Sequence, residues 1–471
     1  MLFFIIFLFT FYNLQIIQKQ WLAIMRISFK EVIMKQRILI LLTVFAMLFT
    51  AGCKKSGSAA KEDGRTVITF WHSMGGNLNE AIDKMVADYN ASQDKYLVKA
   101  EFQGEYDDAL TKLRSASSGS ALDVDIVQVF ELGARFMIDS GLITPVQEMI
   151  DKTNFNTADL EPNLLAYYTI DGKLNSMPFN SSTPLLYYNK DMFKKAGITE
   201  VPKSLEEMVE VGEKLKAKGV EMPLSMSIYG WWVDQFMLKQ EKPLFDMNNG
   251  RGGNPTKTVF VENGGMENIL ERWKELADKG IAPNVGRTGG KQEFVSGVSA
   301  MTFGSTASLA GILQEVGDKF EVGTAYYPAV NKDDKGMVSI GGASLYMIDS
   351  GSDERKAGAW DFISYMVSPK SQAYWNANSG YFPVNVKAHD EDVFKENIKK
   401  FPQFKTAIDQ LHDSTPESQG AICAVYQESR QVFEKYVEDM LNGVKTPKEA
   451  AEAMQKDIDS AINDYNRANK K

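Results

Sequence analysis

Residues 65–130 alternate between the hydrophobic spacing of strands and that of helices, and this alternation constrains the fold more than any other feature of the sequence. Short apolar runs at 65–71, 96–102 and 126–130 have the length and composition of buried strands. Between them, apolar residues recur three and four positions apart, as on one face of a helix. Strands that alternate with helices predict an α/β fold with a mainly parallel sheet and helices on both faces.

Ligands of such a sheet bind beyond the carboxyl ends of its strands, where helix N-termini also point. The segments 71–77, 104–106 and 131–133 follow the three predicted strands. We therefore expect a binding site to draw on these loops.

A second α/β pattern begins after residue 190. Ser204 precedes Leu205-Glu206-Glu207 as a helix N-cap, residues 264–280 have helical spacing, and residues 299–303 and 345–348 have the character of strands. With 471 residues, the chain is also too long for one small core. The sequence therefore predicts two α/β lobes.

The charge of the chain argues against nucleic acid as a partner. Residues 53–471 carry 47 basic and 60 acidic side chains, a formal net charge of −13. Binding to nucleic acid or to an anionic membrane through a basic face needs the opposite balance. We expect contact with a membrane only through an anchor.

No catalytic or metal-binding motif stands out in the sequence. The three histidines, His72, His389 and His412, have neither metal-ligand nor triad spacing, and no glycine-rich phosphate loop follows a strand. Glu131 and Asp234 are one possible carboxylate pair for glycoside hydrolysis among many. We therefore expect a binding protein without metal or cofactor, and a surface carbohydrate-acting enzyme is the alternative.

The stretch 179–190 has an uncharged polar first half and an apolar, aromatic second half. Pro184 keeps Thr183 extended. This pattern predicts a polar turn that leads into a buried strand.

This stretch, Asn180-Ser181-Ser182-Thr183-Pro184 through Lys190, resembles the crossover between the lobes of solute-binding proteins of bacterial ABC importers, in particular those that bind glycerol phosphate. Further motifs of this family recur in the same order, so that the resemblance covers residues 66–470. They are Phe70-Trp71-His72-Ser73-Met74, Ser299-Ala300-Met301-Thr302, Gly341-Gly342-Ala343-Ser344-Leu345, Gly380-Tyr381 and Lys445-Thr446-Pro447.

The resemblance implies the two-lobe type II fold of periplasmic binding proteins, in which each lobe is a mainly parallel sheet flanked by helices. Both lobes are then discontinuous, and hinge crossovers connect them. The N-terminal lobe would comprise residues 65–180 and 342–382, and the C-terminal lobe residues 181–341 and 383–471.

The resemblance also implies a ligand set, and each position holds the residue type that the family uses. The set is Tyr106, Glu131, Ser182, Ser305, Gly342, Tyr381 and Arg430. Arg430 offers a planar fork of donors to phosphate oxygens, and Ser182, Ser305 and the N–H of Gly342 add neutral donors. Glu131 would accept hydrogen bonds from glycerol hydroxyls.

Aromatic residues complete the implied pocket. Tyr106 and Tyr381 would pack against the ligand and donate hydrogen bonds. Family members have two tryptophans in the spacing W-x-G-W; Trp231 matches the second, whereas Ile228 occupies the place of the first. Trp231 and Trp232 are therefore weaker candidates, and the departure leaves room for a larger or different ligand.

As a function, the resemblance implies a non-catalytic receptor that delivers its ligand to an ABC permease driven by a separate ATPase. The expected ligand is glycerol 3-phosphate or a glycerophosphodiester, and an oligosaccharide or another polyol is the alternative.

The N-terminal segment has the features of an export signal. Residues 34–37 are charged, residues 38–50 are apolar, and Ala51-Gly52-Cys53 resembles a bacterial lipoprotein cleavage site, although Thr50 stands where leucine is usual. We expect export to the periplasm or cell surface, lipidation at Cys53, and a flexible tether at 53–64. Residues 1–33 favour a start site placed too far upstream; transmembrane helices are the alternative reading.

Overall fold

The computed structural model describes residues 60–117, 122–415 and 418–469. Within this range, Ala60 to Asn469 belong to one compact unit that spans Ala59–Lys471. No helix among the described residues is both long and apolar enough to cross a membrane. The expectations for the signal, for Cys53 and for most of the tether lie outside the described residues.

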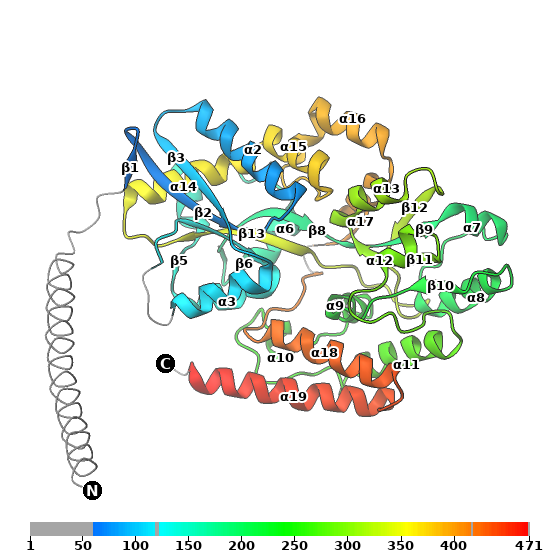
Figure 1. Ribbon diagram of the computed structural model, residues 1–471. Coiled ribbons are helices and arrows are strands. Elements are labelled where there is room, and N and C mark those ends of the chain that lie inside the picture. Colours follow the sequence, from blue (N-terminus) through cyan, green and yellow to red (C-terminus); the bar gives the residue numbers. More distant parts are fainter. Residues whose placement is uncertain (1–59, 118–121, 416–417, 470–471) are drawn as a thin grey trace, which may run out of the picture. The chain divides into compact units, whose positions relative to one another are not determined.

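A seven-stranded sheet is built largely from the first third of the chain (Figure 1). Its backbone order is β1-β2-β4-β13-β5, while β3 pairs with β2 and β8 pairs with β13. The strands are β1 (Lys61–Glu62), β2 (Arg65–His72), β3 (Tyr96–Phe102), β4 (Ile126–Phe130), β5 (Ile143–Thr144), β8 (Met177–Ser182) and β13 (Gly341–Ile348).

A four-stranded sheet has the order β10-β11-β9-β12. Its strands are β9 (Pro184–Asn189), β10 (Met222–Ser225), β11 (Ser299–Ser305) and β12 (Val322–Tyr326). A separate two-stranded ribbon pairs β6 (Thr169–Ile170) with β7 (Lys173–Leu174). Two main sheets with their own helices agree with the predicted pair of α/β regions.

Helices pack against both main sheets, and α9, α11, α18 and α19 form a helical layer of their own (Figure 1). Against the seven-stranded sheet lie α2 (Asn77–Ser92), α3 (Tyr106–Ser117), α6 (Pro162–Tyr168) and α14 (Asp353–Met366). Against the four-stranded sheet lie α7 (Lys190–Lys195), α8 (Leu205–Lys216), α12 (Lys291–Val295) and α17 (Gln403–Asp413). The helical layer contains α9 (Gly230–Lys239), α11 (Gly265–Asp278), α18 (Tyr426–Leu441) and α19 (Pro447–Ala468).

The remaining helices are short or connect these layers. They are α4 (Ala134–Ser140), α5 (Val146–Thr153), α10 (Asp246–Asn249), α13 (Leu309–Val316), α15 (Pro369–Ser379) and α16 (Asp392–Lys400), with the 3-10 turns η1 (Glu131–Gly133), η2 (Thr306–Ser308) and η3 (Val386–Asp390).

The prediction of mainly parallel sheets is wrong. In the seven-stranded sheet β2 pairs in parallel with β3 and β4, but β13 runs antiparallel to β4, β5 and β8. In the four-stranded sheet only β10 and β11 pair in parallel. The cause is the chain path: β13 comes back from the second sheet and enters the first from the opposite direction.

The predicted polar turn at 179–183 is a strand instead. Met177–Ser182 pairs with β13 of the seven-stranded sheet, and after Thr183 alone the chain continues as β9 of the four-stranded sheet. Ser181 also forms a bridge with Phe382. The polar side chains of this strand are buried. The Asn180 side chain is nevertheless satisfied, because its oxygen accepts a hydrogen bond from Gln128 and its nitrogen donates one to the Tyr106 hydroxyl. Thr183 is the single residue between β8 and β9, so it connects the two sheets.

Candidate functional site

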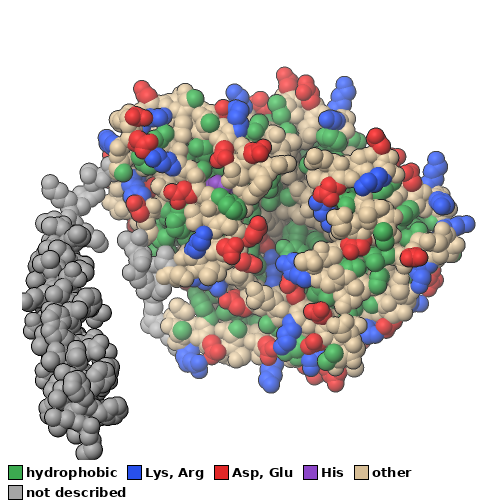
Figure 2. Space-filling view, viewed as in Figure 1, with side chains coloured by type: hydrophobic (Ala, Val, Ile, Leu, Met, Phe, Trp, Pro, Cys, Tyr) green, Lys and Arg blue, Asp and Glu red, His purple; other side chains and the backbone are tan. Residues whose placement is uncertain are grey.

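A cavity of about 390 Å³ is lined by residues from both main sheets. Figure 2 shows a hollow near the middle of the visible face, with hydrophobic side chains inside it. All nine residues that the family resemblance suggested line this cavity. They are Tyr106, Glu131, Ser182, Trp231, Trp232, Ser305, Gly342, Tyr381 and Arg430.

Strand ends and helix starts position most of these residues. Glu131 opens η1 directly after β4, and Tyr106 opens α3. Ser182 is the last residue of β8. Ser305 ends β11, and its hydroxyl accepts a hydrogen bond from the N–H of Ala307 as the N-cap of η2. Glu131, Ser182 and Ser305 thus lie at or directly after the carboxyl ends of strands, the position at which we expect a binding site in such a fold.

Close backbone approach explains two glycines of the site. Gly342 has φ of 95°, and a Cβ at this position would lie 2.0 Å from the carbonyl oxygen of Asn180. A Cβ on Gly230 would lie 2.7 Å from Cβ of Arg430. Only glycine fits these two positions without a shift of the backbone or of Arg430.

Aromatic rings form much of the wall. Tyr106 stacks on Phe130 with the ring centroids 5.2 Å apart, and the Tyr106 hydroxyl accepts a hydrogen bond from Asn180. On the other side, the ring centroids of Trp231 and Trp232 lie 5.5 Å apart, and Tyr229 meets Trp232 edge-on. Such faces suit the CH groups of a polyol or sugar and attract cations.

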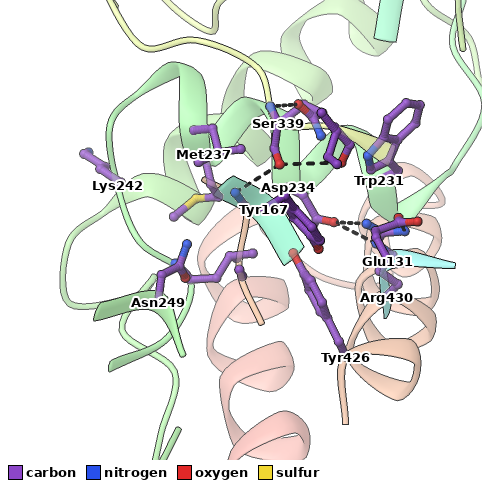
Figure 3. Close-up of a pocket in the computed structure, with 16 residues that line it drawn as sticks. Glu131, Tyr167, Trp231, Asp234, Met237, Lys242, Asn249, Ser339, Tyr426 and Arg430 are labelled. Carbon is purple, nitrogen blue, oxygen red and sulfur yellow. Dashed lines mark hydrogen bonds and ion pairs between the residues drawn. The ribbon is translucent and has the colours of Figure 1, made fainter. Parts of the chain in front are cut away.

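Two carboxylates engage the buried Arg430. Its Nε and Nη2 both lie 2.7 Å from Oδ2 of Asp234, and its Nη1 donates to Oε1 of Glu131 at 2.9 Å. Figure 3 shows these contacts as dashed lines. Arg430, Glu131 and Asp234 are each less than 10% exposed. We name these three residues the acidic triad, because with both carboxylates ionised its formal charge is −1.

The electrostatics of the acidic triad follow from burial. Burial raises the pKa of Asp234 to about 6, although Arg430 works in the other direction. Burial disfavours the charge of Arg430, but Asp234 and Glu131 outweigh it, so the pKa of Arg430 lies well above its ordinary value. Arg430 is therefore cationic throughout the physiological range, and Asp234 titrates near its lower end.

Asp234 contacts the site through Arg430, whereas the sequence suggested it only as one possible carboxylate partner of Glu131. It lies on α9 three positions after Trp231, so both side chains share one helix face. Every residue of α9 from Gly230 to Met237 is buried. An acidic residue in such an apolar helix is a signal of a buried partner, and this signal was available in the sequence.

The described residues contain no group of three metal-ligating side chains. His72 is buried, and burial lowers its pKa to about 4. Glu131 and Asp234 share one arginine, so they do not form the free carboxylate pair that a glycosidase needs. Cys423 is buried and free of any disulfide.

Sequence comparison identifies the relatives of the chain. Residues 84–403 match the model of the bacterial extracellular solute-binding protein family. The sn-glycerol-3-phosphate-binding periplasmic proteins of Shigella flexneri and Escherichia coli K12 are both 31% identical over 415 residues, which is 85% of this chain and 94% of theirs.

The chain matches solved structures of similar fold over nearly the whole length of those structures. The cyclic α-maltosyl-1,6-maltose binding protein of Arthrobacter globiformis matches with a TM-score of 0.71 and 23% identity, covering 85% of this chain and 100% of that one. UgpB of Mycobacterium tuberculosis in complex with glycerophosphocholine gives the same TM-score and identity, covering 85% and 99%. The two-lobe type II fold is therefore confirmed.

Members of this family are receptors rather than enzymes, and they hand small solutes to the permease of an ABC importer. The prediction of a non-catalytic receptor is thus confirmed by its relatives. The chain belongs to the bacterial extracellular solute-binding protein family.

Proposed function

We propose that this receptor captures a glycerophosphoryl solute, either glycerol 3-phosphate or a glycerophosphodiester, between its two lobes and delivers it to the permease and its ATPase. The observation that carries the proposal is that all seven residues of the implied ligand set line one cavity. Curated relatives that are 31% identical carry the name of glycerol-3-phosphate-binding proteins, which supports the same solute class.

The cavity offers each group of such a solute a partner. Ser182 and Ser305 supply hydroxyl donors for phosphoryl oxygens, and the backbone at Gly342 approaches without a side chain. The Glu131 carboxylate accepts from glycerol hydroxyls, while Tyr106 and other rings cover the CH groups. The volume of about 390 Å³ falls within the range of pockets that enclose small molecules.

A neutral sugar or polyol is the second candidate, and one observation favours it. Both carboxylates of the acidic triad occupy donors of Arg430, so this arginine is less available to a phosphate than an isolated one. Stacking on Trp231 and Trp232 would then supply more of the affinity.

Titration calorimetry with sn-glycerol 3-phosphate, glycerophosphocholine and maltotriose tests the proposal. We expect at least one glycerophosphoryl compound to bind near 1 μM, which corresponds to about −8 kcal/mol. The double variant Ser182→Ala/Ser305→Ala should weaken that binding by about 2–4 kcal/mol, since two hydrogen bonds to a charged group are lost.

The matched control is Ser296→Ala, an exposed serine outside the cavity, which should leave the affinity unchanged. Binding of maltotriose alone would replace the proposed solute by a sugar. Equal affinity in the wild type and the double variant would remove both serines from the site.

We propose the lobe boundaries given by the resemblance, with exchanges near residues 180, 342 and 382. Support comes from the strands: β8 and β9 belong to different sheets, and β13 begins at Gly341. We also propose lipidation at Cys53 of the exported chain. Incorporation of labelled palmitate that is lost in Cys53→Ser would establish the anchor.

A further inference from the structure

We propose that Asp234 sets the charge preference of the receptor: it leaves the acidic triad with a net negative charge, so that solutes without net negative charge are preferred to dianions. The proposal rests on the proposed function for its choice of solutes. It concerns a residue that lies behind the cavity wall and acts on the ligand through Arg430, as a positioning and charge-setting residue.

Asp234 lies behind the wall of the larger cavity. It lines a small cavity of about 10 Å³ that shares Glu131, Trp231 and Arg430 with the larger cavity. Asp234 itself does not line the larger cavity. Its Oδ2 is bonded to Nε and Nη2 of Arg430, so it holds the side of the guanidinium that Glu131 leaves open (Figure 3).

Two basic residues line the larger cavity. The other basic residue that lines the larger cavity is Lys291, and its Nζ forms an ion pair with Glu315 at 2.5 Å. Lys291 and Glu315 are both more than 40% exposed, so water screens this pair strongly. The described lining therefore contains no buried positive charge that the acidic triad does not neutralise.

The net charge of the acidic triad affects ligands according to their own charge. At a buried site the attraction between Arg430 and a phosphate is offset by repulsion from two carboxylates. A phosphate monoester carries nearly two negative charges at neutral pH, whereas a phosphodiester carries one and a phosphodiester of choline has no net charge. The aromatic wall with Trp231 and Trp232 suits the cationic end of such a zwitterion.

Calorimetry at pH 8 with three probes tests this assignment: sn-glycerol 3-phosphate, glycerophosphocholine and inorganic phosphate. Asp234→Asn keeps the shape and one oxygen acceptor for Arg430 but removes the charge. We expect glycerol 3-phosphate and inorganic phosphate to bind about 10- to 100-fold more tightly to this variant than to the wild type. Binding of glycerophosphocholine should change less than about threefold.

Asp234→Glu retains the negative charge, so it should keep the wild-type preference for solutes without net negative charge. If Asp234 had only a structural role, this variant would not need to keep the preference. The thermal midpoint of each variant checks that it is folded. If Asp234→Asn shifts all three probes equally, or leaves phosphate binding unchanged, the assignment is overturned.

Failure of the proposed function looks different. In that case neither glycerophosphoryl compound binds the wild type. The role of Asp234 is then tested by inorganic phosphate alone, which should still bind more tightly to Asp234→Asn than to the wild type.

Discussion

Replacement of Arg430 by methionine should destabilise the unliganded receptor strongly, because two buried carboxylates lose their common partner. At about 4 Å and an effective dielectric of about 20, each ion pair is worth roughly 4 kcal/mol before desolvation is subtracted. Breaking a buried pair from one side typically costs about 3–5 kcal/mol. We expect a loss in that range at pH 8 for Arg430→Met.

The loss should depend on pH in a defined direction. Burial already raises the pKa of Asp234 to about 6, and loss of Arg430 removes the group that holds it down. In the variant, Asp234 then takes up a proton in the folded state at a higher pH than in the unfolded state, so the folded state gains stability as the pH falls. The destabilisation should therefore shrink between pH 8 and pH 6.

Urea unfolding of the ligand-free protein, followed by tryptophan fluorescence, measures this effect. The control is Arg467→Met, which breaks a 2.7 Å pair with Asp464 in which the two side chains are 79% and 64% exposed. That change should cost less than about 0.5 kcal/mol. A loss below about 1 kcal/mol for Arg430→Met at pH 8 would refute the reasoning that the acidic triad is buried and mutually dependent.

Two further predictions concern single residues near the sheets. Because burial lowers the pKa of His72 to about 4, the folded state resists its protonation, and the contribution of His72 to the stability should fall by about 2–3 kcal/mol between pH 7 and pH 4.5. Over this pH range His72→Gln should therefore lose less stability than the wild type in urea unfolding, and equal losses would disprove this cause. Gly342→Ala should cost about 3 kcal/mol or more in thermal unfolding, because its Cβ would meet the Asn180 carbonyl, whereas Gly351→Ala, with φ of 67° and open space, should cost about 1 kcal/mol.

Local patterns in the sequence predicted several of the helices and strands. The strands at 96–102 and 126–130 coincide with β3 and β4, and the N-cap Ser204 accepts a hydrogen bond from the N–H of Glu207 as expected. Period and capping residues are local signals, so each window carries its own evidence.

The direction of strand pairing could not be predicted in this way. The pairing of β13 with β4 joins residues more than 200 positions apart, for example Ala343 with Phe130. The local sequence of either strand does not indicate whether the two pair in parallel or antiparallel. The rule that alternating strands and helices give parallel sheets holds for β2, β3 and β4, which are consecutive main strands of one sheet. It fails where the chain leaves the sheet and returns.

The candidate site was predicted from family motifs rather than from spacing. Composition alone made Tyr381 or Arg430 an ordinary core or surface residue, yet both line the cavity with the rest of the set. The partnership of Arg430 with Asp234 was missed because it joins α18 to α9 across 196 positions. The sequence around an arginine does not indicate whether its guanidinium pairs with a ligand or with a carboxylate of the protein itself.

The chain crosses between the two sheets at Thr183, next to residues of the candidate site. Ser182 and Gly342 belong to strands of the seven-stranded sheet and lie beside the exchange at Thr183, while Ser305 belongs to the four-stranded sheet. A solute bonded by Ser182 and Ser305 therefore connects the two sheets directly beside their covalent link. Any state in which both contacts form at once is favoured by the ligand over states in which only one can form. We therefore expect a solute that bonds to both serines to favour closure of the proposed lobes.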